Sequence, residues 1–103
     1  GGIFLEVTPG GARVVAGTSL DIKARARADA GVLLPADADI EVETEDAVTK
    51  RVPMTARSAV GDTRRFEARL DIAVGCGLAR ESEAALAVAG HDEERASSRF
   101  AFA

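Results

Sequence analysis

A row of carboxylates at every second position has the residue type and spacing to bind a cation or a basic partner. They are Asp37, Asp39, Glu41, Glu43 and Glu45. In an extended strand such residues share one face, and water and salt screen their repulsion. A solvated strand face is the favoured interpretation, and a patch for a basic partner or a Ca²⁺ site are the alternatives. Because Ca²⁺ takes about six to eight converging oxygens, an ion is expected only at an end of this row.

Basic side chains form a second row with the same spacing, at Lys23, Arg25 and Arg27. We expect their strand to pair with the strand around Phe66, which places Glu67 and Asp71 across from them. Exposed cross-strand pairs of this kind contribute little to stability, roughly 0.2–1 kcal/mol each. The row is therefore interpreted as a device for register and solubility, with ligand binding as the alternative.

The residues that most often carry catalysis are sparse. Cys76 is the single cysteine and His91 the single histidine, and no flanking pattern links them into a nucleophile and its base. Residues 75–77 form a Gly-Cys-Gly turn without the Lys of a phosphate-binding loop. Residues 91–94 are interpreted as a polar hairpin tip, with a metal ligand or acid–base pair as the alternative. We expect no catalytic residue, no metal ligand and no cofactor.

Alternation of apolar and charged residues predicts the strands that position these rows. The clearest segments are Leu20–Asp29, Ala36–Glu45 and Arg65–Ile72. Weaker candidates are Ile3–Thr8, then Ala12–Val15 as a continuation of the same edge, Lys50–Ala56 and Arg99–Ala103. Pro53 lacks a backbone donor, so its segment is expected at a sheet edge or in a bulge.

The segment Ala79–Ala89 allows two interpretations. A strand through Leu86 and Val88 is favoured, and a helix capped at Gly90 is the alternative. In the strand, three alanines face outward and form a flat strip: Ala85, Ala87 and Ala89. With the neighbouring row of carboxylates they form a surface that could dock another domain or subunit. The other interpretation is that alanine is simply frequent in this chain.

About seven strands with turns every 8–14 residues predict an all-β fold, either a sandwich or a barrel. The expected core is Leu5, Val7, Leu20, Ile22, Ile40, Val42, Met54, Phe66, Leu70, Ile72, Leu86, Val88, Phe100 and Phe102. The 103 residues fit a single domain, 1–103, and both ends suggest a piece cut from a longer protein.

Charge and hydropathy exclude some function classes. The chain carries 13 basic and 17 acidic residues, for a net charge of −4. This balance argues against sequence-independent binding of nucleic acid, so we expect no nucleic-acid partner. No apolar run approaches the roughly 20 residues of a membrane span, and a membrane is expected only through a parent chain.

The segment Glu6–Leu20 resembles the start of a bacterial immunoglobulin-like domain, or of the related fibronectin-type-III-like class. It has a β-rich start, a turn at Pro9-Gly10-Gly11, a short second strand and a Ser-Leu strand opening. The segments Arg65–Ile72, Ala84–His91 and Ser97–Phe102 resemble the last three strands of such a domain. The resemblance implies an antiparallel, immunoglobulin-like sandwich of about seven strands. The chain departs from the family in having one Cys, no Trp and no Tyr, so a tyrosine corner is absent.

Two functions from different classes follow as expectations. The first is a non-catalytic structural or protein-interaction module of a larger bacterial protein. The resemblance places that protein in the periplasm or at the cell surface, where neighbouring domains or another protein are the partners. The second is an accessory domain of a larger enzyme that binds a cation or a carbohydrate. An enzyme in its own right is not expected.

Overall fold

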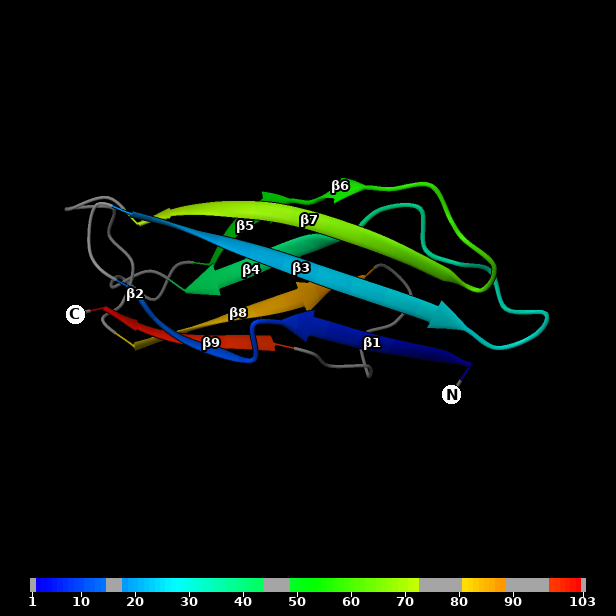
Figure 1. Cartoon of the computed structure of the whole chain (residues 1–103), viewed down its shortest axis with the longest axis horizontal. Coiled ribbons are helices and arrows are strands. Elements are labelled where there is room, and N and C mark those ends of the chain that lie inside the picture. The colour runs from blue at the N-terminus through cyan, green and yellow to red at the C-terminus, as the bar shows by residue number, and fades with distance from the viewer. Residues whose placement is uncertain (1, 15–17, 44–48, 73–80, 89–96, 103) are drawn as a thin grey trace.

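Two sheets packed face to face form the protein. The computed structural model describes residues 2–14, 18–43, 49–72, 81–88 and 97–102, and within these ranges it contains nine strands and no helix. The strands are β1 (Ile3–Thr8), β2 (Gly11–Val14), β3 (Thr18–Ala28), β4 (Asp39–Glu43), β5 (Thr49–Pro53), β6 (Thr55–Ala56), β7 (Thr63–Ile72), β8 (Glu81–Ala87) and β9 (Ser97–Phe102) (Figure 1). The predicted all-β sandwich is confirmed.

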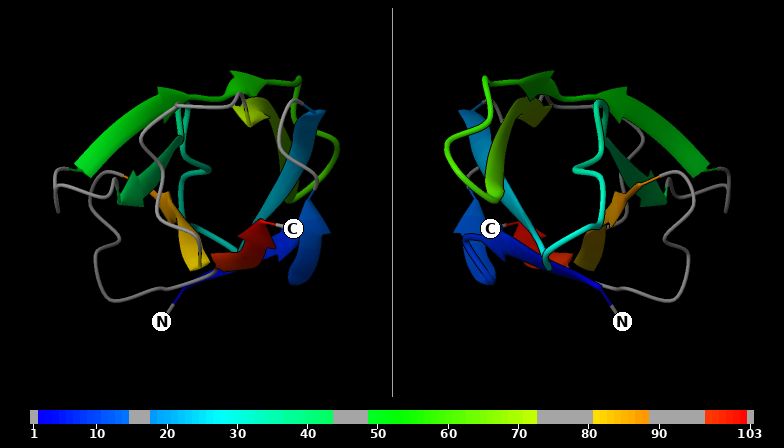
Figure 2. Two further views of the ribbon diagram at one scale, coloured as in Figure 1. Left: turned by 90° about the vertical axis from the view of Figure 1, so that its left-hand side faces the viewer. Right: turned by 90° about the vertical axis from the view of Figure 1, so that its right-hand side faces the viewer.

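The sheets differ in strand order. Sheet A has the order β1-β3-β7-β6 and is antiparallel throughout. Sheet B has the order β2-β9-β8-β4-β5, in which β2 runs parallel to β9 and the other pairs are antiparallel. Figure 2 shows the two sheets from both ends.

The central strand of sheet A follows directly from its alternating sequence. Ile22, Ala24, Ala26 and Ala28 are buried, while the charged residues between them are exposed. β3 pairs with β7, as predicted, and Lys23 lies opposite Glu67. The second predicted opposition is wrong, because the register places Asp71 opposite Ser19 and not opposite a basic residue.

The described strands place five crossings between the two sheets, and two of these crossings lie directly at a proline. β1 belongs to sheet A and β2 to sheet B, so Ala12–Val15 does not continue the first edge as predicted. Pro9 lacks the N–H needed to extend the ladder, so the strand ends there. After Pro53, the buried Met54 donates its N–H to the Ala38 carbonyl at 3.0 Å, and β6 joins sheet A. β5 and β6 are both edge strands, which confirms the edge predicted for Pro53.

Two segments show how far the pattern alone is reliable. β4 begins at Asp39, so the predicted strand from Ala36 is too long at its start. The Ala38 carbonyl bonds to Met54 instead of continuing the sheet ladder. Glu81–Ala87 is a strand, which confirms the favoured interpretation of that segment over a helix.

The apolar core lies between the sheets. Predicted core residues found buried are Leu5, Val7, Ile22, Ile40, Val42, Met54, Phe66, Leu70, Leu86 and Val88. Leu20 is partly buried against this cluster, and Ile3, Ala24, Ala26 and Ala38 complete it. The side chains of Ile72, Phe100 and Phe102 lie outside the described residues, as do Cys76 and His91.

Candidate functional site

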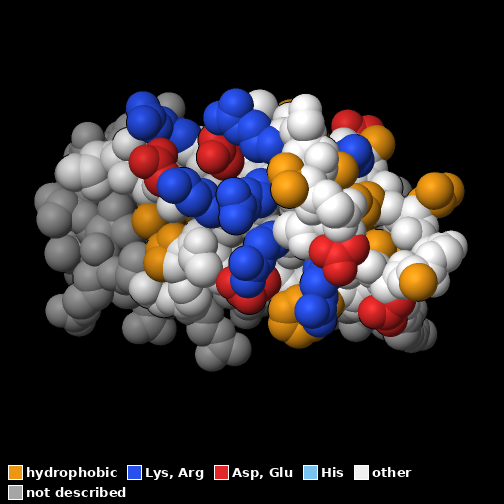
Figure 3. Space-filling view, turned by 45° about the vertical axis from the view of Figure 1, so that its right-hand side comes forward, with side chains coloured by type: hydrophobic (Ala, Val, Ile, Leu, Met, Phe, Trp, Pro, Cys, Tyr) orange, Lys and Arg blue, Asp and Glu red, His pale blue; other side chains and the backbone are white. Residues whose placement is uncertain are grey.

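Basic side chains gather on the outer face of sheet A. Their positions follow from the same alternation that buries the alanines of β3, because every second residue of β3 and β7 points outward. The cations are Lys23, Arg25, Arg27, Arg57, Arg65 and Arg69, and the carboxylates among them are Glu6, Asp21 and Glu67. We call this set the basic face; Figure 3 shows its blue side chains outnumbering the red ones between them.

Each carboxylate of the basic face is paired with one arginine. Arg25 Nη2 donates to Glu6 Oε2 at 2.9 Å, and Arg69 Nε donates to Asp21 Oδ1 at 3.0 Å. Arg57 Nη2 donates to Glu67 Oε2 at 2.7 Å. These side chains are 42–67% exposed, so the pairs add little to stability. Their main effect is to neutralise the three carboxylates.

Cations therefore remain in excess. Within the described part of the chain, Lys23 and Arg65 form no ion pair. Arg65 lies directly opposite Arg25 across the β3–β7 pair. Directly opposed like charges destabilise a sheet, and the ion pair of Arg25 with Glu6 offsets only part of this repulsion, because Arg65 has no carboxylate partner among the described residues. Binding of an anion between the two guanidinium groups would remove that repulsion.

Shallow hollows lie on this face, among them one of about 350 Å³ bordered by Asp21, Lys23, Thr55, Glu67 and Arg69 and two that lie further along the row of cations. The first of these two, of about 190 Å³, is bordered by Thr8, Lys23, Arg25 and Arg65 together with Glu6 and Glu67. The second, of about 200 Å³, lies between Phe4, Arg25, Arg27 and Thr63. Arg65 and Lys23 border the first hollow and form no ion pair with a described carboxylate, so their hydrogen-bond donors can serve a ligand there. Hydrogen-bond donors and positive charge around an open hollow suit an anionic group.

An aromatic ring lies at one end of the basic face. Phe4 points outward from β1 and is 54% exposed, although β1 buries Ile3 and Leu5 on either side. The Arg27 guanidinium lies over the Phe4 ring, 5.5 Å from its centroid. This cation–π contact leaves more than half of the residue in water.

Arg57 sets the acidity of one carboxylate. The hydrogen bond and positive charge of Arg57 hold the pKa of Glu67 below its ordinary value of 4.5, and Lys23 acts in the same direction. Partial burial and Asp21 raise the pKa by smaller amounts. Glu67 is therefore a carboxylate at neutral pH and remains one in mildly acidic solution.

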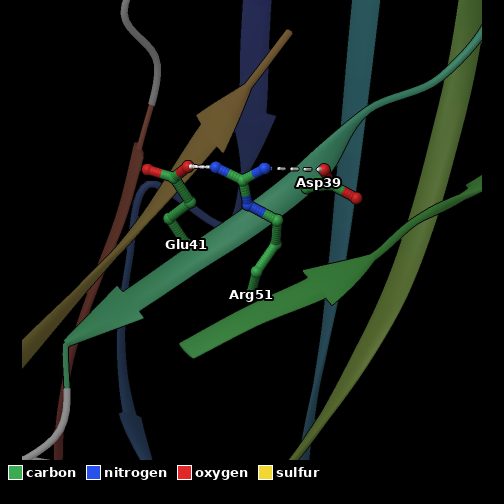
Figure 4. A network of polar contacts seen from close by, with 3 residues as sticks. All are labelled: Asp39, Glu41 and Arg51. Atoms are coloured by element: carbon green, nitrogen blue, oxygen red, sulfur yellow. Dashed lines mark hydrogen bonds and ion pairs between the residues drawn. The ribbon is translucent and has the colours of Figure 1, made fainter. Parts of the chain in front are cut away.

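The predicted acidic row is divided by the structure. Asp37 is exposed and precedes β4, whereas Asp39 and Glu41 lie on β4. Arg51 of β5 bonds to Glu41 and lies 3.9 Å from Asp39 (Figure 4). The row is thus not a uniformly solvated ladder of five carboxylates. The side chain of Glu43 and the whole of Glu45 fall outside the described residues.

The predicted alanine strip is beside these carboxylates. Ala87 lies opposite Asp39 and Ala85 lies opposite Glu41, so the four residues share the outer face of sheet B. Both alanines are half-buried, and Ala89 is among the residues that the structure does not describe. The sequence therefore predicted the neighbourhood correctly, and whether this surface binds a partner stays a prediction.

Among the described ranges, no three side chains of the metal-binding types are clustered. The turn at 91–94 and the turn around Cys76 lie outside those ranges. No helix in the described part is long and apolar enough to cross a membrane.

Sequence reasoning identified the row on β3 but not the full basic face. Arg65 and Phe4 were missed as functional candidates. Their neighbours Arg25 and Arg27 are brought to them only by the register of β1, β3 and β7. The available signal was the outward position of Arg65 in its alternating segment and of Phe4 between two core residues.

Comparison with known proteins identifies the fold class. No family model and no curated protein sequence matches the chain. A solved structure of the Pseudomonas fluorescens alkylpurine DNA glycosylase AlkC, bound to DNA containing an abasic-site analogue, is similar with a TM-score of 0.61 and 14% identity. The match covers 98% of this chain and 30% of the glycosylase. A marsupial T cell receptor is similar with a TM-score of 0.54 and 14% identity, over 99% of this chain and 52% of that chain.

These likenesses define an immunoglobulin-like β-sandwich. At 14% identity they show the shared fold alone. The chain spans about a third of the glycosylase and about half of the receptor chain.

The exclusion of nucleic acid as a partner was wrong. A structure that shares this fold is that of a protein bound to DNA, so neither the fold nor a modest negative charge excludes such a partner. The physical reason lies in the distribution of charge. A net charge of −4 sums over the whole surface, whereas binding depends on the potential at one face, and the basic face has six cations and three carboxylates.

Proposed function

We propose that this chain is a non-catalytic binding domain of a larger protein and that the basic face is its binding surface for a polyanion. The observation that carries the proposal is the opposition of Arg25 and Arg65 at the centre of sheet A, with Lys23 beside them. Repulsion between these side chains is relieved by a bound anion. A row of anions suits the face better than a single one, because its cations extend along two strands.

A place in a larger protein is supported by the lengths of the similar structures. The fold makes up only part of each of those chains. The glycosylase structure contains DNA, which makes nucleic acid the first polyanion to test. A bacterial source and a location in the periplasm or at the cell surface remain predictions of the sequence resemblance.

The surface on sheet B is the weaker candidate. Arg51 already neutralises the charge of Asp39 and Glu41 in part, so these carboxylates have less free charge for a basic partner. No observation favours the cation-binding or carbohydrate-binding accessory domain over the basic face.

Titration with a polyanion tests the proposal. A fluorescein-labelled heparin fragment is added to the protein, and its anisotropy is measured over a series of salt concentrations. We expect binding whose affinity falls as salt rises, because cations on the polymer are released. Removal of one contacting cation should lower the slope of log affinity against log salt by about one.

Matched variants locate the binding surface. Lys23→Glu is the test variant on the basic face. Lys50→Glu is its control, because it makes the same change of charge at an exposed residue of β5 on sheet B. We expect Lys23→Glu and Arg65→Glu to weaken binding and Lys50→Glu to have little effect. The proposal would be refuted by equal losses in Lys23→Glu and Lys50→Glu, or if neither the heparin fragment nor nucleic acid binds at low salt.

A further inference from the structure

We infer that the polyanion is single-stranded nucleic acid, with its phosphates on the cations of β3 and β7 and an unstacked base on Phe4. This inference rests on the proposed function and names the ligand of the same surface. It depends on two features that occur together on sheet A, a regular row of cations and an exposed aromatic ring.

The cations are spaced regularly along β3. Lys23, Arg25 and Arg27 occupy alternate positions, so their Cα atoms are separated by roughly 6.6–6.8 Å along the strand. Arg65 stands beside Arg25 on β7 and widens the row at its centre. A regular row of charges fits a flexible polymer with one phosphate per unit. The phosphate groups would lie over the first hollow, where Thr8 adds a hydroxyl donor.

The aromatic ring distinguishes nucleic acid from other polyanions. Phe4 is opposite Arg27 and borders the second hollow with Arg25 and Thr63. The ring is 54% exposed at the end of a basic row, and bases stack on such rings and on arginine planes. Sulfated sugars and inorganic polyphosphate have no aromatic surface to place there.

The same ring favours a single strand over a duplex. Bases in a duplex are stacked on one another, so their faces are not accessible to a side chain. A single strand presents base faces and phosphates together. In the described residues, the outer face of sheet A has shallow hollows and carries no helix or ribbon that projects to enter a duplex groove.

The test compares three fluorescein-labelled probes by anisotropy: a mixed-sequence single strand of about 12 nucleotides, the same sequence as a duplex, and the heparin fragment. A length of about 12 nucleotides is within the range that small single-strand-binding domains cover. We expect the single strand to bind more tightly than the duplex of equal length. Its affinity should fall with salt, with a slope of about −0.7 for each phosphate contact.

Substitution of the ring isolates the stacking. Phe4→Ala should weaken single-strand binding by about tenfold, as expected for loss of one base–aromatic stack. It should leave the salt slope and heparin binding unchanged, because the ring is uncharged. Phe4→Tyr keeps the aromatic ring and should retain single-strand binding. Leu33→Ala is the matched control, since Leu33 is an exposed apolar residue, 89% accessible, outside the basic face.

The outcomes separate the inference from the proposed function. If heparin binds but the single strand binds no more tightly than the duplex, or Phe4→Ala behaves as the parent protein while melting normally, the inference is wrong and the proposed function stands. If none of the three probes binds at low salt, both are wrong. If Phe4→Ala does not fold, the NMR signals of the Phe4 ring protons are followed instead. An upfield shift on addition of the single strand, with binding retained in Phe4→Tyr, supports the inference, and the absence of a shift overturns it.

Discussion

Ile22 shows how strictly a single position on β3 is constrained. Its side chain is 0% exposed between the sheets, while its neighbours Asp21 and Lys23 are in solvent. An ionised carboxylate in its place would be buried without a partner, which costs a large part of a typical folding free energy of about 5–15 kcal/mol.

We therefore expect Ile22→Asp to abolish folding, seen as loss of the cooperative thermal transition in circular dichroism. Lys23→Asp introduces the same residue at the adjacent outward position and should melt cooperatively. A soluble Ile22→Asp protein with a cooperative transition would contradict the inward orientation of residue 22.

Glu67 provides a test of electrostatics at one exposed carboxylate. Its pKa is lowered mainly by the Arg57 hydrogen bond and charge. Because the pKa of Glu67 is lowered in the folded state, its pair with Arg57 stabilises the protein at pH values above the pKa that the carboxyl group has in the unfolded chain. This stabilisation is lost as the pH falls through the folded value.

We expect the titration midpoint of Glu67, followed by side-chain carbon NMR, to lie below 4.5. Arg57→Gln should raise the midpoint toward its ordinary value, and Arg57→Lys, which keeps the charge, should retain part of the depression. The stability difference between the parent protein and Arg57→Gln should shrink on acidification. An unchanged midpoint in Arg57→Gln would show that Arg57 does not set the acidity of Glu67.

At the scale of elements, Arg64 connects β7 to the loop before β4. Its Nη1 donates to the Pro35 carbonyl at 2.7 Å, across 29 residues of sequence. Arg64 lies opposite the buried Ala26, so it is on the inner face of sheet A and is half-buried. The contact holds the chain as it crosses from sheet A to sheet B at this end of the sandwich.

Removal of this donor should destabilise the fold. Arg64→Met keeps much of the side-chain volume and is expected to lower the free energy of unfolding by about 1–2 kcal/mol, because a charge-assisted hydrogen bond is lost. Urea denaturation measures the effect. Arg65→Met, at the adjacent outward position, should change stability much less. Equal stability of the two variants would mean that the Pro35 contact contributes nothing.

At the scale of the whole molecule, the described charges are distributed unequally between the two sheets. The outer face of sheet A has an excess of cations, while Asp39, Glu41 and Arg51 cluster on sheet B. The molecule is elongated, with extents of 45 × 23 × 19 Å, so the basic face lies along its length. Its field is therefore that of a charged strip, which a single net charge cannot describe.

The sequence by itself determined where the long strands of sheet A lie and which side of them is buried. Alternation in β3 and β7 separates inward from outward residues, because successive side chains of a strand point to opposite faces. For this reason the burial of Ile22 and Phe66, and the shared face of Lys23, Arg25 and Arg27, were predictable. Local chemistry also explains why strands stop at Pro9 and Pro53, which cannot donate to the ladder.

Only the tertiary structure decided which residues meet across strands. Strand order and register decide three contacts: Arg25 lies opposite Arg65, Phe4 lies opposite Arg27, and Arg51 pairs with Glu41. The transfer of Gly11–Val14 to sheet B beside β9 depends on residues almost 90 positions away. Such contacts follow from how two whole sheets bury their apolar faces together, and alternation within one strand carries no information about its neighbours.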